Sequence, residues 1–228
     1  MAGEGFVTNL YIDKYIIGRI MNIYLIRHGR QNSRLCNADV ELAREGRRQA
    51  ELLGKRLEKY KIDGLYSSHL IRARQTAEII NKYIYQEHII RENISESSFG
   101  EMEGKSNEYI YEYYADFKKE QMKLEEDIAY PGGESGRDVY TRAIVTIEEI
   151  LNSGKENVIV VTHGGVIRSL MAGLLGFDMS KKLLFGQSLE NTSITQFFYN
   201  EEEKRFYLQR FNDYGHLEGE SDLIGYSW

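Results

Sequence analysis

The chain of 228 residues is predicted to fold as an α/β protein, a three-layer α/β/α sandwich with a mostly parallel central sheet and a small helical cap. Two apolar runs, 23–26 and 158–161, are each followed after one residue by a histidine and then a glycine. Short β-branched runs bounded by glycine are typical of buried parallel strands. Segments with helical spacing of apolar residues alternate with such runs, which favours helices on both faces of one sheet.

The first half of the chain is expected to supply three strands and two helices. A strand begins at Met21, and an amphipathic helix follows over 43–60 with Ala50, Leu53 and Leu57 on one face. The periodicity then predicts a strand over 62–67, a helix over 70–84 and an edge strand over 89–94.

The second half begins with a segment of different character. Residues 109–124 have a helical pattern but are rich in Tyr, Lys and Glu, which predicts a helical cap over the crevice, of about 97–133, and not a part of the sheet. The only proline, Pro131, ends the cap. The remaining elements are expected to be a helix from about residue 134, a strand over 158–161, a helix over 166–175, and a hairpin of 192–199 and 205–211.

These elements predict one domain over 21–217. Residues 1–20 are treated as an N-terminal extension and residues 218–228 as a C-terminal tail. Residues 1–20 lack the apolar core of a signal peptide, because Asp13 and Lys14 interrupt it. No apolar run approaches the length of a membrane helix.

The charge pattern points to a small anion as the partner. A net charge of −6 argues against nucleic acid, which requires a basic surface. Residues 27–38 nevertheless contain Arg27, Arg30 and Arg34 and no acid, so a basic pocket is expected in an acidic protein. The single cysteine, Cys36, excludes an intrachain disulfide and fits a reducing compartment, so a cytoplasmic location is expected.

Several common catalytic motifs are absent. Gly104-Lys105-Ser106 lacks the earlier glycine and the leading strand of a phosphate-binding P-loop. There is no GxSxG and no HExxH, and a single cysteine removes the usual zinc clusters, so no metal site is expected.

The two strand-end histidines, His28 and His163, are expected at one crevice, because ligands of open α/β sheets bind beyond the carboxyl ends of the strands. Arg72 follows the second predicted strand, and Glu96 follows the edge strand. Imidazoles together with arginines suit chemistry on a phosphate group.

At this point the sequence resembles the histidine phosphatase superfamily, which includes the cofactor-dependent phosphoglycerate mutases. The matching pieces, in order, are 25–29, 42–50, 67–77, Glu96 with Phe99-Gly100 and Glu103-Gly104, 131–135, 161–165, and Asn212 with His216-Leu217.

The resemblance implies a covalent phosphohistidine mechanism without a metal or a dissociable cofactor. His28 would be the nucleophile, Arg27 and Arg72 the phosphate clamp, and His163 a hydrogen-bond donor to the same oxygens. Glu96 would be the proton donor, with Glu101 and Glu103 as rival carboxylates.

The chain departs from the family pattern in the loop after His28. Arg30 and Gln31 replace an acidic or amide residue followed by threonine or serine, and Arg34 stands where an asparagine is usual, although Asn32 or Asn37 could replace it. We therefore expect Arg30, Gln31 and Arg34, together with Gly164, to contact the substrate, and the arginines suit a second negative group.

The expected function is hydrolysis of a small phosphorylated metabolite. Glu96 and Glu134 are only 38 residues apart, whereas the mutase branch usually carries a longer insertion there, so a phosphatase is preferred to a mutase. A non-catalytic phosphate- or phosphoprotein-binding module is the second alternative. No nucleic acid or membrane partner is expected, and a homodimer stays open.

Overall fold

The computed structural model describes residues 19–225, and the predicted extension 1–20 lies outside that range except for its last two residues. A six-stranded sheet in the order β3-β2-β4-β1-β5-β6 forms its centre. The strands are β1 (Ile20–Arg27), β2 (Gly64–Ser68), β3 (His88–Arg91), β4 (Asn157–Thr162), β5 (Ile194–Asn200) and β6 (Arg205–Asp213). β3, β2, β4 and β1 are parallel, while β5 and β6 add an antiparallel hairpin. The predicted mostly parallel sheet is therefore confirmed.

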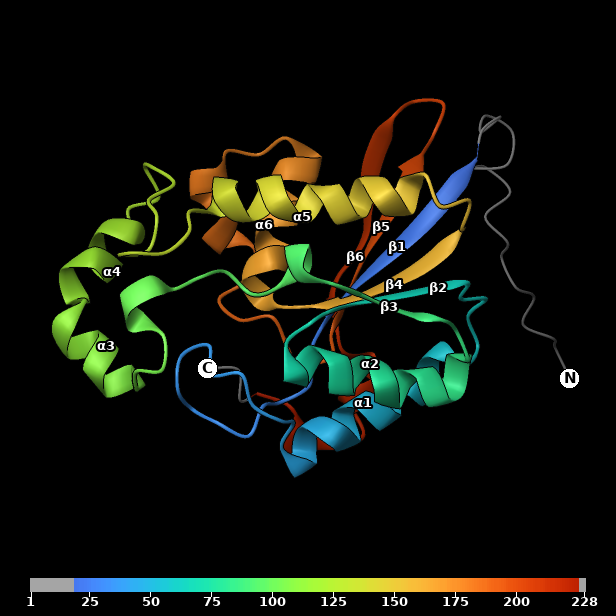
Figure 1. Cartoon of the computed structure of the whole chain (residues 1–228), viewed down its shortest axis with the longest axis horizontal. Coiled ribbons are helices and arrows are strands. Elements are labelled where there is room, and N and C mark those ends of the chain that lie inside the picture. Colours follow the sequence, from blue (N-terminus) through green and yellow to red (C-terminus); the bar gives the residue numbers. More distant parts are fainter. Residues whose placement is uncertain (1–18, 226–228) are drawn as a thin grey trace, which may run out of the picture.

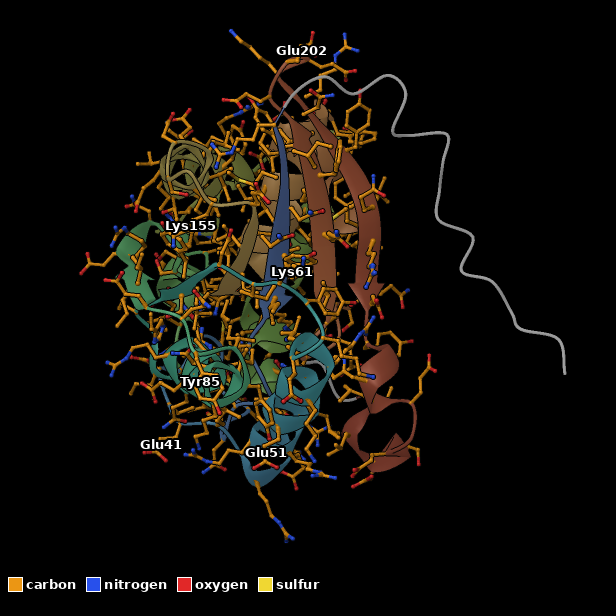
Figure 2. The ribbon with its side chains drawn as sticks, turned by 90° about the vertical axis from the view of Figure 1, so that its right-hand side faces the viewer. Glu41, Glu51, Lys61, Tyr85, Lys155 and Glu202 are labelled. Atoms are coloured by element: carbon orange, nitrogen blue, oxygen red, sulfur yellow. The ribbon has the colours of Figure 1, made fainter. Side chains whose placement is uncertain are left out.

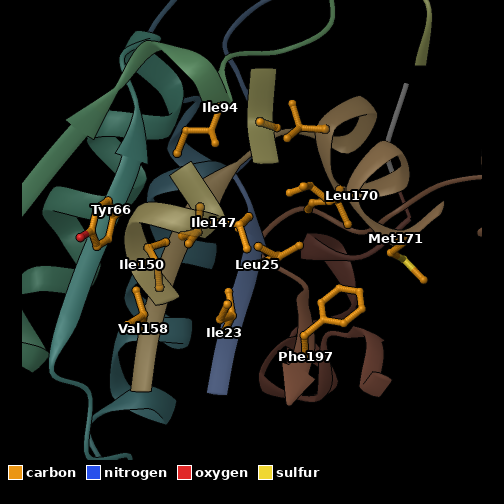
Figure 3. Close-up of a cluster of buried hydrophobic side chains, with 14 of the residues drawn as sticks. Ile23, Leu25, Tyr66, Ile94, Ile147, Ile150, Val158, Leu170, Met171 and Phe197 are labelled. Atoms are coloured by element: carbon orange, nitrogen blue, oxygen red, sulfur yellow. The ribbon is translucent and has the colours of Figure 1, made fainter. Parts of the chain in front are cut away.

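Helices cover both faces of this sheet (Figure 1). The pair α1 (Arg44–Leu57) and α2 (Ile71–Ile84) packs on one face, and the pair α5 (Gly136–Leu151) and α6 (Gly164–Leu175) packs on the other. Figure 3 shows Ile23 and Leu25 of β1 packed beneath Ile147 of α5 and Leu170 of α6. The α/β/α sandwich is confirmed.

The amphipathic spacing of α1 has the predicted consequence. Leu53 and Leu57 are fully buried against β1, β2 and α2, and Ala50 is fully buried beside Ile79 of α2. Glu51 on the opposite side faces solvent (Figure 2). Burial of large apolar side chains stabilises a fold by about 1.5–3 kcal/mol each, so this face fixes the helix on the sheet.

The edge strand is shorter than predicted. β3 does lie at the edge of the sheet, but it ends at Arg91 and a 3-10 turn, η1 (Glu92–Ile94), follows. The turn forms because Ile94 is drawn into the core, where its carbonyl accepts a hydrogen bond from Thr162 Oγ1 at 2.7 Å. This bend directs the next residues toward the carboxyl end of β4.

The cap is helical, as the pattern over 109–124 predicts, and contains two short helices. α3 (Asn107–Tyr113) and α4 (Ala115–Gln121) follow a 3-10 turn, η2 (Gly100–Met102), and lie at one end of the sandwich (Figure 1). Tyr114 breaks the helix with φ −122° and ψ 21°, and its hydroxyl donates to Glu101 Oε2 at 3.2 Å. Periodicity predicts the helical character of the cap but does not register such a local tertiary contact.

The C-terminal segment returns to α1. After the 3-10 turn η3 (Met179–Leu184) and the hairpin come η4 (Gly215–Leu217) and η5 (Ser221–Leu223). Gln49 Nε2 donates to the Leu223 carbonyl at 2.9 Å, and Arg48 pairs with Glu220. The described part of the expected tail, 218–225, thus packs on the domain. Across residues 19–225, no helix is both long enough and apolar enough to span a bilayer.

Candidate active site

His28 lies immediately after β1, where three other segments hold its backbone. Its N–H donates to the Thr162 carbonyl of β4 at 2.9 Å, and its carbonyl accepts from Asn191 Nδ2 at 2.8 Å. The next N–H, that of Gly29, donates to Thr76 Oγ1 of α2 at 3.0 Å. Contacts from β4, α2 and the loop before β5 therefore fix the imidazole at the carboxyl end of the parallel strands.

The hydrogen bonds of His28 define a neutral tautomer. Nδ1 donates to the Gly29 carbonyl at 2.7 Å, while Nε2 accepts from Arg72 Nε at 3.2 Å. Burial, followed by the nearby charges of Arg72 and Arg27, holds the pKa of His28 well below its ordinary value of 6.5. Nε2 consequently carries a lone pair at neutral pH, as a nucleophile requires.

Arg72 is the second residue of α2 and is almost fully buried beside His28. Its guanidinium donates to Asn37 Oδ1 at 2.8 Å and to the Ala38 carbonyl at 3.1 Å, and Asp39 lies 3.9 Å away. Of the two asparagines left open by the sequence, Asn37 is the one at the site, whereas Asn32 is exposed and outside the cavity.

Arg27 and His163 are also close to His28. The His163 ring is completely buried, its centroid is 5.0 Å from that of His28, and burial holds its pKa well below 6.5. Arg27 donates to the Leu189 carbonyl, and burial lowers the pKa of Arg27 to about 10, so it stays charged at neutral pH. Arg27 Nε and both His163 ring nitrogens are buried without a partner among the described residues. Such groups are suited to binding a phosphoryl oxygen.

Glu96 follows η1 and is held against the first turn of α6. Its Oε1 accepts from the N–H of Ser97 at 2.8 Å and of Gly165 at 3.1 Å. The rival carboxylates have other contacts: Glu103 Oε1 accepts from Ser98 Oγ and Phe99 N, and Glu101 accepts from Tyr114. Of these three acids, only Glu96 lines the cavities at the site.

Two cavities meet here. The larger, about 760 Å³, extends from His28 and Arg72 to the cap, and the smaller, about 230 Å³, lies at the start of α6. Arg30, Gln31 and Arg34 line the larger cavity, and Gly164 lines the smaller one. Both cavities share the wall residues Arg27, Glu96, Phe99, Tyr130, Leu183 and Gln187.

Sequence reasoning missed several residues at the site. Lys118 of α4 faces the larger cavity, where its ammonium lies 5.2 Å from the Tyr130 ring centroid and burial lowers its pKa. A lysine in a polar cap helix carries no sequence signal for this position. Arg168 lines the smaller cavity, and its place in the first turns of the helix after His163 could have revealed it.

Over residues 19–225, no three His, Cys, Asp or Glu side chains are arranged to hold a metal ion. The cations at the site are instead side chains of the chain itself, chiefly Arg27 and Arg72.

Comparisons with known proteins identify the family. The model of the histidine phosphatase superfamily (branch 1) matches residues 23–214. Phosphoglycerate mutase-like protein 4 of Arabidopsis thaliana is 32% identical over 209 residues, which are 86% of each chain. Phosphoserine phosphatase 1 of Hydrogenobacter thermophilus is 31% identical over 180 residues, 78% of this chain and 83% of the relative.

A solved structure, that of mycobacterial glucosyl-3-phosphoglycerate phosphatase, superimposes with a TM-score of 0.75 at 27% identity and covers 85% of this chain and 99% of its own. The chain therefore belongs to branch 1 of the histidine phosphatase superfamily and is a phosphoglycerate mutase-like histidine phosphatase.

Proposed function

We propose that this enzyme hydrolyses the phosphomonoester of a small metabolite through a covalent intermediate on Nε2 of His28. The observation that carries this proposal is the single neutral tautomer of His28, with Nδ1 donating to Gly29 and Nε2 left as a base beside Arg72. A reducing, cytoplasmic setting is part of the proposal and depends on the single cysteine.

In the first step, the Nε2 lone pair attacks phosphorus and the bond from phosphorus to the ester oxygen breaks. Arg27, Arg72 and His163 would bind the equatorial oxygens, where charge concentrates in the transition state. The imidazole becomes positively charged, and the Nδ1–H bond to the Gly29 carbonyl at 2.7 Å strengthens as it does so.

The leaving oxygen would take its proton from Glu96. Two N–H groups donate to Oε1 within 3.1 Å, whereas the nearest donor to Oε2 is 3.4 Å away. A proton would therefore reside on Oε2, because a protonated Oε1 would lose an acceptor site. The same carboxylate then accepts a proton from water as the water oxygen attacks phosphorus, and breaking the P–Nε2 bond restores His28.

Arg30, Gln31 and Arg34 are proposed to contact the leaving group, because they line the larger cavity beyond His28. That cavity is far larger than a phosphate group, so water can reach the phosphohistidine, which favours hydrolysis over mutase chemistry. The two relatives named as phosphatases support the same choice.

A phosphate-release screen over sugar phosphates, glycerate phosphates, phosphoamino acids and nucleotides tests this proposal. We expect His28→Ala to lower kcat by at least about 1,000-fold, as the loss of a catalytic nucleophile usually does. Glu96→Gln should lower kcat by about 100- to 10,000-fold. Rapid quenching should trap an acid-labile, base-stable phosphoenzyme in the wild type. His69→Asn is the matched control, because His69 is exposed and outside both cavities.

Full activity of His28→Ala would refute the proposed nucleophile. Isomerisation of 3-phosphoglycerate with 2,3-bisphosphoglycerate and little free phosphate would instead identify a mutase. No turnover of any ester would favour the binding-module alternative.

A further inference from the structure

The smaller cavity has a charge pattern that the phosphoryl site does not explain. It measures about 230 Å³, far above the roughly 10–15 Å³ that one water requires. Its walls come from the starts of α5 and α6, from η3 and from the loop 187–189. Because it shares Arg27 and Glu96 with the larger cavity, a ligand at His28 can extend into it.

Besides Arg27 and Glu96, which belong to the phosphoryl site, three charged side chains line the cavity, and two of them are already in ion pairs. Glu134 accepts two hydrogen bonds from Arg142, at 2.7 and 2.9 Å, and Lys182 pairs with Asp127. Arg168, the third of these, differs from Glu134 and Lys182, because none of the carboxylates in the described residues lies within 4.0 Å of its guanidinium. Burial lowers the pKa of Arg168, and the negative charge of Glu96 raises it by less.

The guanidinium of Arg168 is held in place by hydrogen bonds, but not all of its donors have a partner. One terminal nitrogen donates to the carbonyls of Gly186 and Gln187 at 3.0 and 3.2 Å, and Nε is buried without a partner. A largely buried cation that has only carbonyl partners is costly, and a bound anion would remove that cost.

The position of Arg168 relates it directly to the phosphoryl site. The point one bond from the Gly164 Cα, where a Cβ would lie, is 3.5 Å from Arg168 Nη1 and 3.8 Å from Arg27 Nε. Two guanidinium groups thus flank Gly164 at the N-terminus of α6, where the helix dipole also favours negative charge. An anion beside Gly164 would lie next to the phosphoryl group that Arg27 is proposed to hold.

We propose that Arg168 binds a carboxylate of the substrate in the smaller cavity, so that the enzyme selects small phosphorylated acids. This inference rests on the proposed function and deepens it. Because Arg27 borders both cavities, the carboxylate must lie only a few bonds from the ester oxygen. Planar carboxylates suit arginine, which can bind both oxygens at once.

The larger cavity offers the rival position. Arg34 lines it and also suits a second negative group, so a carboxylate directed toward the cap would contact Arg34 instead of Arg168. Two substrate pairs that differ at the acid group separate these positions: 3-phosphoglycerate against glycerol 3-phosphate, and phosphoserine against phosphoethanolamine.

The experiment measures kcat/KM for each pair in the wild type, Arg168→Gln, Arg168→Lys and Arg34→Ala. We expect the wild type to prefer the acid, and Arg168→Gln to reduce that preference by about 10- to 100-fold, mainly through KM, as the loss of a charge-assisted contact predicts. Arg168→Lys should retain part of the preference. Arg137→Gln is the matched control, because Arg137 is exposed near the start of α5 and outside the cavity.

Binding provides a readout that does not need turnover. Calorimetry with His28→Ala should show tighter binding of 3-phosphoglycerate than of glycerol 3-phosphate, and Arg168→Gln in that background should abolish the difference. An equal loss on both members of a pair, a preference that only Arg34→Ala removes, or no preference at all would overturn the inference. Activity that survives His28→Ala would refute the proposed function alone, since the preference is measured separately.

Discussion

At the scale of single residues, the position of Glu96 depends on the absence of a side chain at residue 165. A Cβ on Gly165 would lie 2.5 Å from Glu96 Oε1 and 2.3 Å from Ser97 Oγ, closer than real Cβ contacts permit. We expect Gly165→Ala to displace the Glu96 carboxylate and to lower kcat by at least about 10-fold, because proton transfer requires hydrogen-bond geometry. Steady-state kinetics, with circular dichroism to verify folding, measure this.

The loss in kcat should act through Glu96, since Glu96 is the proposed proton donor. Gly165→Ala is therefore expected to add little to the loss caused by Glu96→Gln, since coupled residues are not additive. Fully multiplicative losses in the double variant would show that Gly165 affects the reaction by another route.

The residues that the sequence placed near one another do come together. Arg72 donates a hydrogen bond to His28, and the ring of His163 lies beside that of His28. Glu96 lines the same cavity as His28 and Arg72. For the two histidines, position after a strand was sufficient to predict this, because parallel strands bring their carboxyl ends to one edge, whereas the places of Arg72 and Glu96 at the site were implied by the resemblance to the family. Lys118 and Arg168 were missed because their places depend on how a cap and a helix fold back over that edge.

At the scale of elements, the loop after β1 is held by its close crossing with α1. A Cβ on Gly46 would lie 2.1 Å from the Arg30 carbonyl oxygen, a backbone atom that cannot move without shifting the loop. We expect Gly46→Ala to destabilise the protein by about 1–3 kcal/mol, the usual cost of overpacking, and to lower activity as the loop carrying His28 shifts. Urea unfolding and phosphate release measure the two effects.

Gly219→Ala is the matched control, because a Cβ there meets no atom within 4 Å. Unchanged stability of Gly46→Ala would mean that the crossing is loose and does not hold the loop.

Elements with strong periodicity were predicted well, and elements set by local contacts were not. α1, with its buried face of Ala50, Leu53 and Leu57, appears within a few residues of its predicted span. The edge strand was predicted too long, and the division of the cap into two helices was not predicted, because Ile94 and Tyr114 leave regular structure to make tertiary contacts. Packing overrides local propensity at such points.

At the scale of the whole molecule, the neutral histidines that suit the proposed chemistry weaken the fold in acid. Four of the five histidines, His28, His88, His163 and His216, have pKa values lowered chiefly by burial. Each binds a proton more readily in the unfolded chain, whose histidines titrate near 6.5. The unfolded state therefore gains protons first as the pH falls below about 6.5, and stability must decrease.

His216 allows a quantitative prediction, because burial lowers its pKa to about 4. Because the pKa in the unfolded chain is near 6.5, this residue alone should lower the free energy of unfolding by about 2 kcal/mol as the pH falls from 7.5 to 5. Asp213, with its pKa lowered to about 2 mainly by Arg56, stabilises the fold above about pH 4 and loses that effect only at lower pH. The window from pH 7.5 to 5 thus reports mainly on histidines.

Urea unfolding at pH 7.5 and pH 5 should show a decrease of at least about 2 kcal/mol in the wild type. His216→Asn should decrease by about 2 kcal/mol less over the same interval, whatever its stability at pH 7.5, because the titrating group is gone. Comparing the decrease in unfolding free energy between the two pH values in each protein separates the titration of His216 from the packing lost around Thr192. The Thr192 hydroxyl lies 3.0 Å from His216 Nε2. Equal decreases in the two proteins would mean that His216 titrates normally in the folded state, and the acid sensitivity would then belong to His28, His88 and His163.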